Sequence, residues 1–149
     1  MNKLISLSVA VLFLFAFSVP QSFGFFLSKH KKVEAEDGVV RLAIDKIGDG
    51  SAHYFVYNDN GQDVKFFVVR SQDGVIRAAF DACDVCFHSK KGYSQEGDFM
   101  VCNNCGRKFH SSRINIVKGG CNPAPLHRVE QGKYLVLKVS DIVTGARYF

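Results

Sequence analysis

Residues 81–110 read DACDVCFHSKKGYSQEGDFMVCNNCGRKFH, and this segment organises the chain around it. It contains two C-x-x-C pairs, Cys83/Cys86 and Cys102/Cys105, with fifteen residues between the pairs. Two intervening residues let the chain curl so that both sulfurs of a pair face one point, and two such pairs can surround a metal with four thiolates. The spacing is therefore a strong metal-site signal, with these four cysteines as the expected ligands. It suits iron, an iron–sulfur cluster or zinc and leaves that choice open.

A fifth cysteine and one histidine extend the candidate site. Cys121 follows the second pair after fifteen further residues, in the rigid sequence Gly119-Gly120-Cys121-Asn122-Pro123. It is a ligand that replaces one of the four, a ligand to a second metal, a reactive redox thiol or a packed small residue, and the sequence leaves these alternatives open. His110 comes soon after the second pair and is the histidine that we favour as a further ligand.

The N-terminus has the layout of an export signal. Lys3 precedes a nearly unbroken apolar run over residues 4–19, which is typical of a secretory signal peptide. We expect residues 1–24 to be a signal peptide or, alternatively, an N-terminal membrane anchor, with membrane attachment through residues 4–27. Both alternatives place the domain outside the cytoplasm, in the periplasm or on the outer face of the inner membrane.

The compartment changes how the charges and cysteines are interpreted. Residues 25–38 contain a lysine cluster and are expected to form a basic tether, and the formal net charge of +5 is modest. We expect no nucleic-acid partner for an exported protein of this charge. Thiols outside the cytoplasm tend to form disulfides, but five cysteines leave one unpaired. Metal-bound thiolates resist oxidation, so we favour a metal site over a disulfide framework.

Apolar runs separated by turn signals predict a mainly β fold, with a β-rich α+β fold as the alternative. One such signal is the turn sequence Asn58-Asp59-Asn60-Gly61, which we expect to join two neighbouring strands. We expect residues 39–149 to form a small single domain, an antiparallel meander that carries the cysteine-rich segment. Phe66–Val69 is apolar on both faces, which predicts a central strand buried on both sides. A helical turn is expected at 140–143, with Ser140 as its N-cap. The strands are expected at residues 39–44, 52–57, 64–70, 75–80, 98–101, 107–110 and 134–139.

Two stretches of the chain, 42–55 and 137–149, echo each other. Each reads as a strand, a polar turn, a glycine and an aromatic segment. Shared local folding rules explain the echo, and the alternative is a duplicated unit that packs the two ends of the chain together.

Several motifs together resemble a known family. They are Phe80–Cys86, Lys91-Gly92-Tyr93, Val101–Gly106 and Gly119–Leu126. In this combination the chain resembles the membrane iron–sulfur-containing proteins, a family similar in setting to the D component of Ftr-type bacterial iron-transport systems. The resemblance implies an extracytoplasmic, often membrane-attached domain with a metal centre that assists iron uptake or electron delivery.

One function is preferred and two alternatives remain. We expect an extracytoplasmic protein with an iron–sulfur cluster or iron, which assists iron transport or electron transfer and has membrane iron-transport or redox components as partners. The alternatives are a structural zinc-binding module of a transporter and an exported thiol redox or metallochaperone protein. No triad, phosphate loop or paired carboxylates stand out, so we expect an electron carrier or accessory protein rather than an enzyme.

Overall fold

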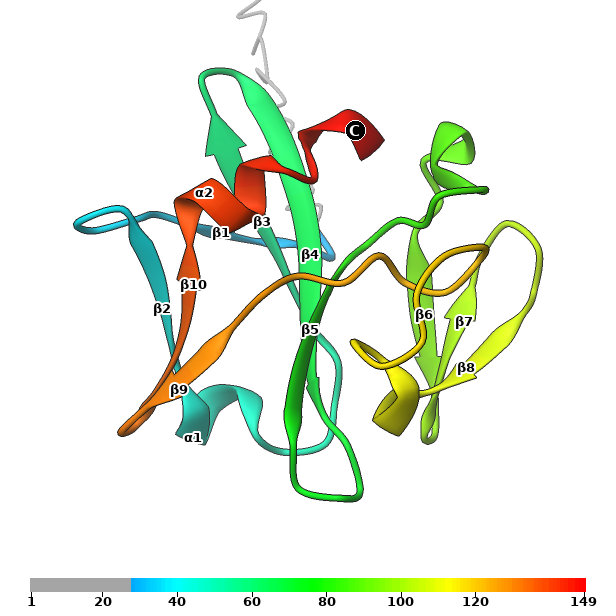
Figure 1. Ribbon diagram of the computed structural model, residues 1–149, viewed down its shortest axis with the longest axis horizontal. Coiled ribbons are helices and arrows are strands. Elements are labelled where there is room, and N and C mark those ends of the chain that lie inside the picture. Colours follow the sequence, from blue (N-terminus) through cyan, green and yellow to red (C-terminus); the bar gives the residue numbers. More distant parts are fainter. Residues whose placement is uncertain (1–27) are drawn as a thin grey trace, which may run out of the picture.

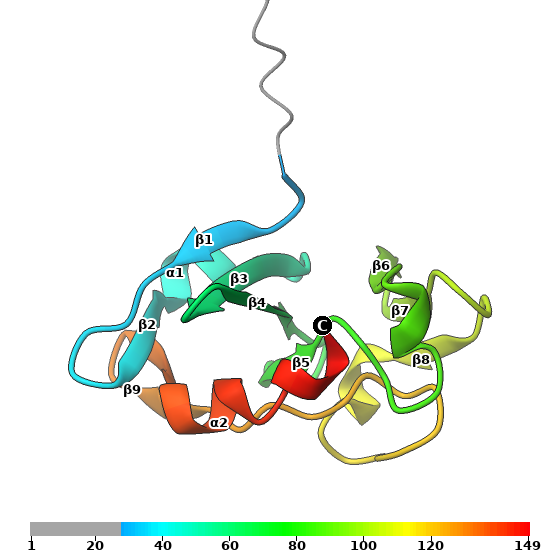
Figure 2. The same ribbon diagram turned by 90° about the horizontal axis from the view of Figure 1, so that it is seen from above.

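The computed structural model describes residues 28–149, and three small β-sheets form its framework (Figure 1). One sheet of four strands lies between two sheets of three strands each (Figures 1 and 2). The predicted mainly β fold is therefore confirmed.

The predictions for residues 1–24 and for membrane attachment through residues 4–27 lie outside the described residues. Within 28–149, no helix has the length and apolar character needed to cross a membrane.

The central sheet is a meander with one added edge strand. Its strands are β3 (His53–Asp59), β4 (Gln62–Arg70) and β5 (Ile76–Phe80), which pair antiparallel, and β1 (Lys31–Val33), which pairs parallel with β3. The β3–β4 hairpin closes through Asn60 and Gly61, whose φ angles of 49° and 96° suit the tight turn that matches the twist of two strands. The turn predicted at this Asn-Gly sequence is confirmed.

Strand β4 is the centre of the molecule. Phe66, Phe67, Val68 and Val69 are all 0% exposed. Because side chains alternate across a strand, Phe66 and Val68 enter one hydrophobic cluster, and Phe67 and Val69 enter a second one. The predicted strand buried on both sides is confirmed, and its two faces join the two outer sheets into one domain.

The sheet on one side pairs the second strand of the described residues with the last strand. It contains β2 (Val39–Ala43), β9 (Val129–Gln131) and β10 (Tyr134–Lys138), with β2 and β10 paired antiparallel. A short helix follows each of the two paired strands, α1 (Ile44–Ile47) after β2 and α2 (Val139–Val143) after β10. The sequence echo thus corresponds to two strand–helix units whose strands lie side by side, with α1 and α2 at opposite ends of the sheet (Figure 1).

The helical turn predicted near the C-terminus is present, but its start was predicted wrongly. Lys138 is the N-cap residue of α2, and Ser140 already lies inside the helix. The reason is the preceding strand, which ends at Lys138, after which the Val139 N–H donates to the Gly38 carbonyl. Tertiary pairing therefore sets the start of this helix, in place of the local capping preference of serine.

The sheet on the other side carries part of the cysteine-rich segment. It consists of β6 (Tyr93–Glu96), β7 (Phe99–Cys102) and β8 (Lys108–His110). The hairpin of β7 and β8 was predicted, whereas β6 was not, because its sequence Tyr-Ser-Gln-Glu lacks a strand pattern. Tyr93, Met100 and Cys102 of this sheet pack in the second hydrophobic cluster against the face of β4 that carries Phe67. The hairpin is thereby held against the central sheet.

Candidate metal centre

The cysteines come from three separate segments of the chain that the fold brings to one place. Cys83 and Cys86 lie in the loop after β5, and Cys102 ends β7 just before the tight turn that carries Cys105. Cys121 lies on the long connection to β9. That connection is fastened to the end of β5, because the Phe80 N–H donates to the Ala124 carbonyl at 2.8 Å and the Ala124 N–H to the Ala82 carbonyl at 2.9 Å.

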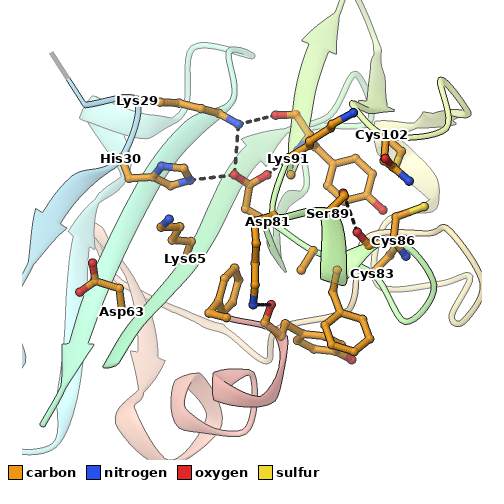
Figure 3. Close-up of a pocket in the computed structure, with 18 of the residues that line it drawn as sticks. Lys29, His30, Asp63, Lys65, Asp81, Cys83, Cys86, Ser89, Lys91 and Cys102 are labelled. Carbon is orange, nitrogen blue, oxygen red and sulfur yellow. Dashed lines mark hydrogen bonds and ion pairs between the residues drawn. The ribbon is translucent and has the colours of Figure 1, made fainter. Parts of the chain in front are cut away.

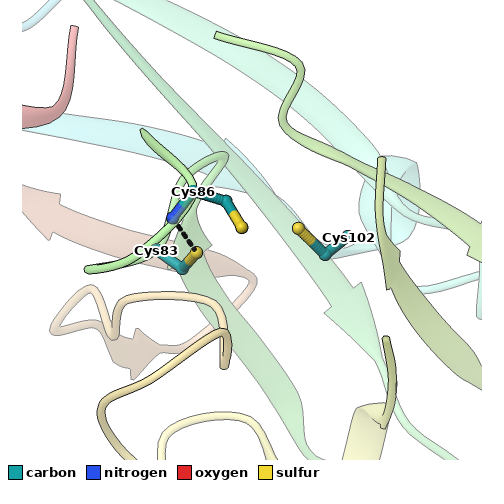
Figure 4. A group of neighbouring side chains, drawn as sticks. All are labelled: Cys83, Cys86 and Cys102. Atoms are coloured by element: carbon teal, nitrogen blue, oxygen red, sulfur yellow. Dashed lines mark hydrogen bonds between the residues drawn. The ribbon is translucent and has the colours of Figure 1, made fainter. Parts of the chain in front are cut away.

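The five sulfurs form two groups of three, and all five cysteines lie within the described residues. The sulfurs of Cys83, Cys86 and Cys102 lie within 4.8 Å of one another (Figure 4), and so do those of Cys86, Cys105 and Cys121. Cys86 belongs to both groups, and its sulfur is 3.8 Å from that of Cys121. None of the five is in a disulfide. The four predicted ligands are thus brought together, and Cys121 joins them.

The geometry fits metal thiolates. With metal–sulfur bonds of about 2.3 Å, tetrahedral coordination places sulfurs about 3.8 Å apart, which is the separation of Cys86 and Cys121. The Cys86 backbone N–H donates to the Cys83 sulfur at 3.1 Å, a contact that stabilises thiolate charge. Gly106, at φ 72°, closes the turn after Cys105. This donor set of sulfur alone suits iron–sulfur clusters, iron or zinc.

The thiols differ in how readily they ionise. Burial raises the pKa of the Cys102 thiol to about 11 and the pKa of the Cys121 thiol to about 12. Cys105 is exposed, and a backbone hydrogen bond from Arg107 lowers its pKa to about 7. Without metal, Cys105 is therefore partly a thiolate near neutral pH, whereas Cys102 and Cys121 keep their protons. A metal must displace those protons in order to bind.

A cavity of about 380 Å³ opens beside the first sulfur group. Cys83, Cys86 and Cys102 line one side of it, and Lys29, His30 and Lys65 stand on the other side (Figure 3). Asp63 and Asp81 also line the cavity, and lysines outnumber these two carboxylates in its lining.

A buried carboxylate fixes the backbone between the two parts of the centre. Asp81 lies 2.7 Å from His30 Nε2 and 3.1 Å from Lys29 Nζ, and it accepts a hydrogen bond of 2.6 Å from the Tyr93 N–H. A side chain at Gly92 would collide with this carboxylate, since a Cβ there would lie 2.5 Å from Asp81 Oδ2. Asp81 thus ties the loop of Cys83 to the start of β6. The sequence did not reveal this contact, because His30 and Asp81 are 51 residues apart.

Two predicted features, the further ligand His110 and the basic tether at residues 25–38, make contacts that the sequence did not predict. His110 is in neither sulfur group; its Nδ1 lies 2.7 Å from the Ser112 hydroxyl, and its ring packs edge-on against Phe99. Within the segment predicted as a basic tether, residues 31–33 form strand β1, and Lys29 and His30 contact Asp81.

Comparisons with known proteins give one family match. A family model described as "Membrane iron-sulfur containing protein FtrD-like" matches residues 47–149. A search of curated proteins finds no match. Among solved structures, the quaternary ammonium Rieske monooxygenase CntA in complex with an inhibitor is similar at 15% sequence identity and a TM-score of 0.42. That match covers 65% of this chain and 30% of the monooxygenase chain.

Proposed function

We propose that this chain, which belongs to the family of FtrD-like membrane iron-sulfur containing proteins, transfers electrons for iron transport on the outer side of a cytoplasmic membrane. The matched residues 47–149 include all five cysteines. The family description gives the class of cofactor and the membrane setting. The electron-transfer role, the side of the membrane and partners among iron-transport or redox components are the proposal.

The observation that carries the proposal is the gathering of five cysteine sulfurs beside an open cavity. Cysteine thiolates are the usual ligands of iron–sulfur clusters, which supply one-electron redox chemistry when bound. Cys83, Cys86 and Cys102 would hold the part of the centre that faces the cavity. A redox partner that reaches this cavity comes close to the ligands without having to bind the metal.

The surroundings of the sulfurs suit such a role. Hydrogen bonds to sulfur and access to solvent set the potential of an iron–sulfur centre, and the Cys86 N–H supplies one such bond to Cys83. A cationic side chain across the cavity, Lys65, would offset part of the negative charge of a thiolate-ligated centre and attract a partner with an acidic surface.

The proposal is tested by a redox titration of the full-length chain purified in detergent without oxygen. We expect visible absorption that dithionite bleaches and a mild oxidant restores. The variant Cys83→Ser should lose this absorption, while His110→Gln should keep it, because His110 lies in neither sulfur group. A colourless protein that contains only zinc would reject the proposal in favour of a structural zinc-binding module.

Exposure of one ligand favours a second candidate, an exported thiol redox or metallochaperone protein. Cys105 is exposed, in contrast to the buried Cys83, Cys102 and Cys121, so an incoming thiol or metal carrier can reach it. Transfer of Cu(I) or Zn²⁺ from the loaded chain to a chelating acceptor protein would be measured. This candidate predicts rapid transfer that Cys105→Ser abolishes, whereas an electron carrier retains its metal in the presence of the acceptor.

A further inference from the structure

We infer that the five cysteines build a centre for two metal ions, with Cys86 between them. Cys83 and Cys102 face one metal position, and Cys105 and Cys121 face the other. The inference deepens the proposed function, on which it rests for the identity of the metal as iron. It selects one of the alternatives that the sequence leaves open for Cys121, a ligand to a second metal, and it departs from the expectation that the two C-x-x-C pairs surround a single metal.

The grouping of the sulfurs argues for two positions. One tetrahedral ion with four thiolates requires four sulfurs that are all close to one another. The structure instead divides the second C-x-x-C pair, since Cys102 groups with the first pair and Cys105 groups with Cys121. Each group of three can hold one ion, and Cys86 is within reach of both.

The position of Cys121 is fixed by contacts that need no metal. Its residue is only 8% exposed, and the Tyr93 hydroxyl donates a hydrogen bond of 2.6 Å to its carbonyl. Gly119 and Gly120 precede it with φ angles of 81° and 61°, a backbone that residues with a side chain rarely adopt. These backbone contacts therefore hold the Cys121 sulfur near that of Cys86 without any metal.

Cobalt provides a direct count. The full-length chain in detergent is stripped of metal under reducing, oxygen-free conditions and titrated with Co²⁺, with thiolate-to-cobalt absorption and native mass spectrometry as readouts. We expect two ions per wild-type chain, one in Cys121→Ser, one in Cys83→Ser and two in His110→Gln. One ion in the wild type, or an unchanged count in Cys121→Ser, would overturn the inference.

Two further measurements keep the outcomes separate. Circular dichroism establishes that each variant is folded. Cys121→Ala replaces Cys121→Ser if the serine hydroxyl disturbs the buried site. Even if both variants fail to fold, the number of cobalt ions bound by the wild type decides between one metal position and two. Reconstitution with iron and sulfide then tests the proposed function independently. Two cobalt ions without any iron centre would reject the function and keep the inference, while a redox-active iron centre in a chain that binds one cobalt ion would do the reverse.

Discussion

Replacement of Tyr93 by phenylalanine isolates the hydrogen bond that holds Cys121. The Tyr93 side chain is 1% exposed, and its hydroxyl donates to the Cys121 carbonyl at 2.6 Å. The substitution removes one oxygen atom and keeps the ring, which packs 6.1 Å from Phe67 and 6.4 Å from Phe109 between ring centroids. No large cavity forms, so the effect reports the hydrogen bond.

The expected cost follows from the burial of the acceptor. A buried polar group that loses its partner costs about 1–3 kcal/mol. With a urea m-value of about 2 kcal/mol/M for a small protein, the unfolding midpoint should fall by about 0.5–1.5 M. The segment that carries Cys121 should also loosen. In the cobalt titration, the ion held by Cys105 and Cys121 should therefore bind more weakly.

The chain supplies a matched control in Tyr54. Its hydroxyl is buried and has no hydrogen-bond partner among the described residues, so Tyr54→Phe removes an unsatisfied polar atom and should leave the free energy of unfolding unchanged or slightly higher. Urea unfolding of the metal-free chains, followed by circular dichroism, compares the two variants. Equal midpoints for Tyr93→Phe and Tyr54→Phe would refute the role given to the Tyr93 hydroxyl.

Three further predictions concern the framework. Gly145→Ala should lower the free energy of unfolding by about 1–3 kcal/mol, because the new methyl group would overlap the ring of Phe80; an unchanged thermal midpoint would contradict this packing. The ion pair with Arg77 lowers the pKa of Asp73 to about 2, so its stabilisation is present above about pH 4 and is lost as the pH falls towards 2. Urea midpoints of the wild type and Asp73→Asn should therefore converge over this range, and a constant difference would argue against the pair. A fragment limited to the family match, 47–149, lacks β1 and β2 and should show no cooperative unfolding, whereas the longer fragment that starts at residue 28 should.

Local sequence patterns predicted the elements whose conformation is set by residues that are neighbours in the chain. The Asn60-Gly61 turn identified the β3–β4 hairpin, and the doubly apolar Phe66–Val69 identified the central strand. Strand β6 was not predicted, because its side chains are mostly polar and its extended conformation depends on pairing with β7. Ser140 was chosen as a cap on local preference, although the strand before it determines where α2 begins.

The site was predictable as a set of cysteines but not as an arrangement. The spacing of the C-x-x-C pairs identified four cysteines that the structure does bring together. Which cysteines group with which depends on the packing of the connection that carries Cys121 against the end of β5. Likewise, the contact between the His30 ring and the Asp81 carboxylate joins residues that are far apart in the chain. Contacts of this kind depend on the tertiary fold, about which residue spacing carries no information.

Analysis of iron and acid-labile sulfide in the full-length chain, purified without oxygen, tests the central claim most directly. Iron and sulfide together in the purified wild type, and neither of them in Cys86→Ser, is the result expected if these cysteines hold an iron–sulfur centre. Zinc without iron or sulfide in the wild type, or an iron content that Cys86→Ser leaves unchanged, would contradict it.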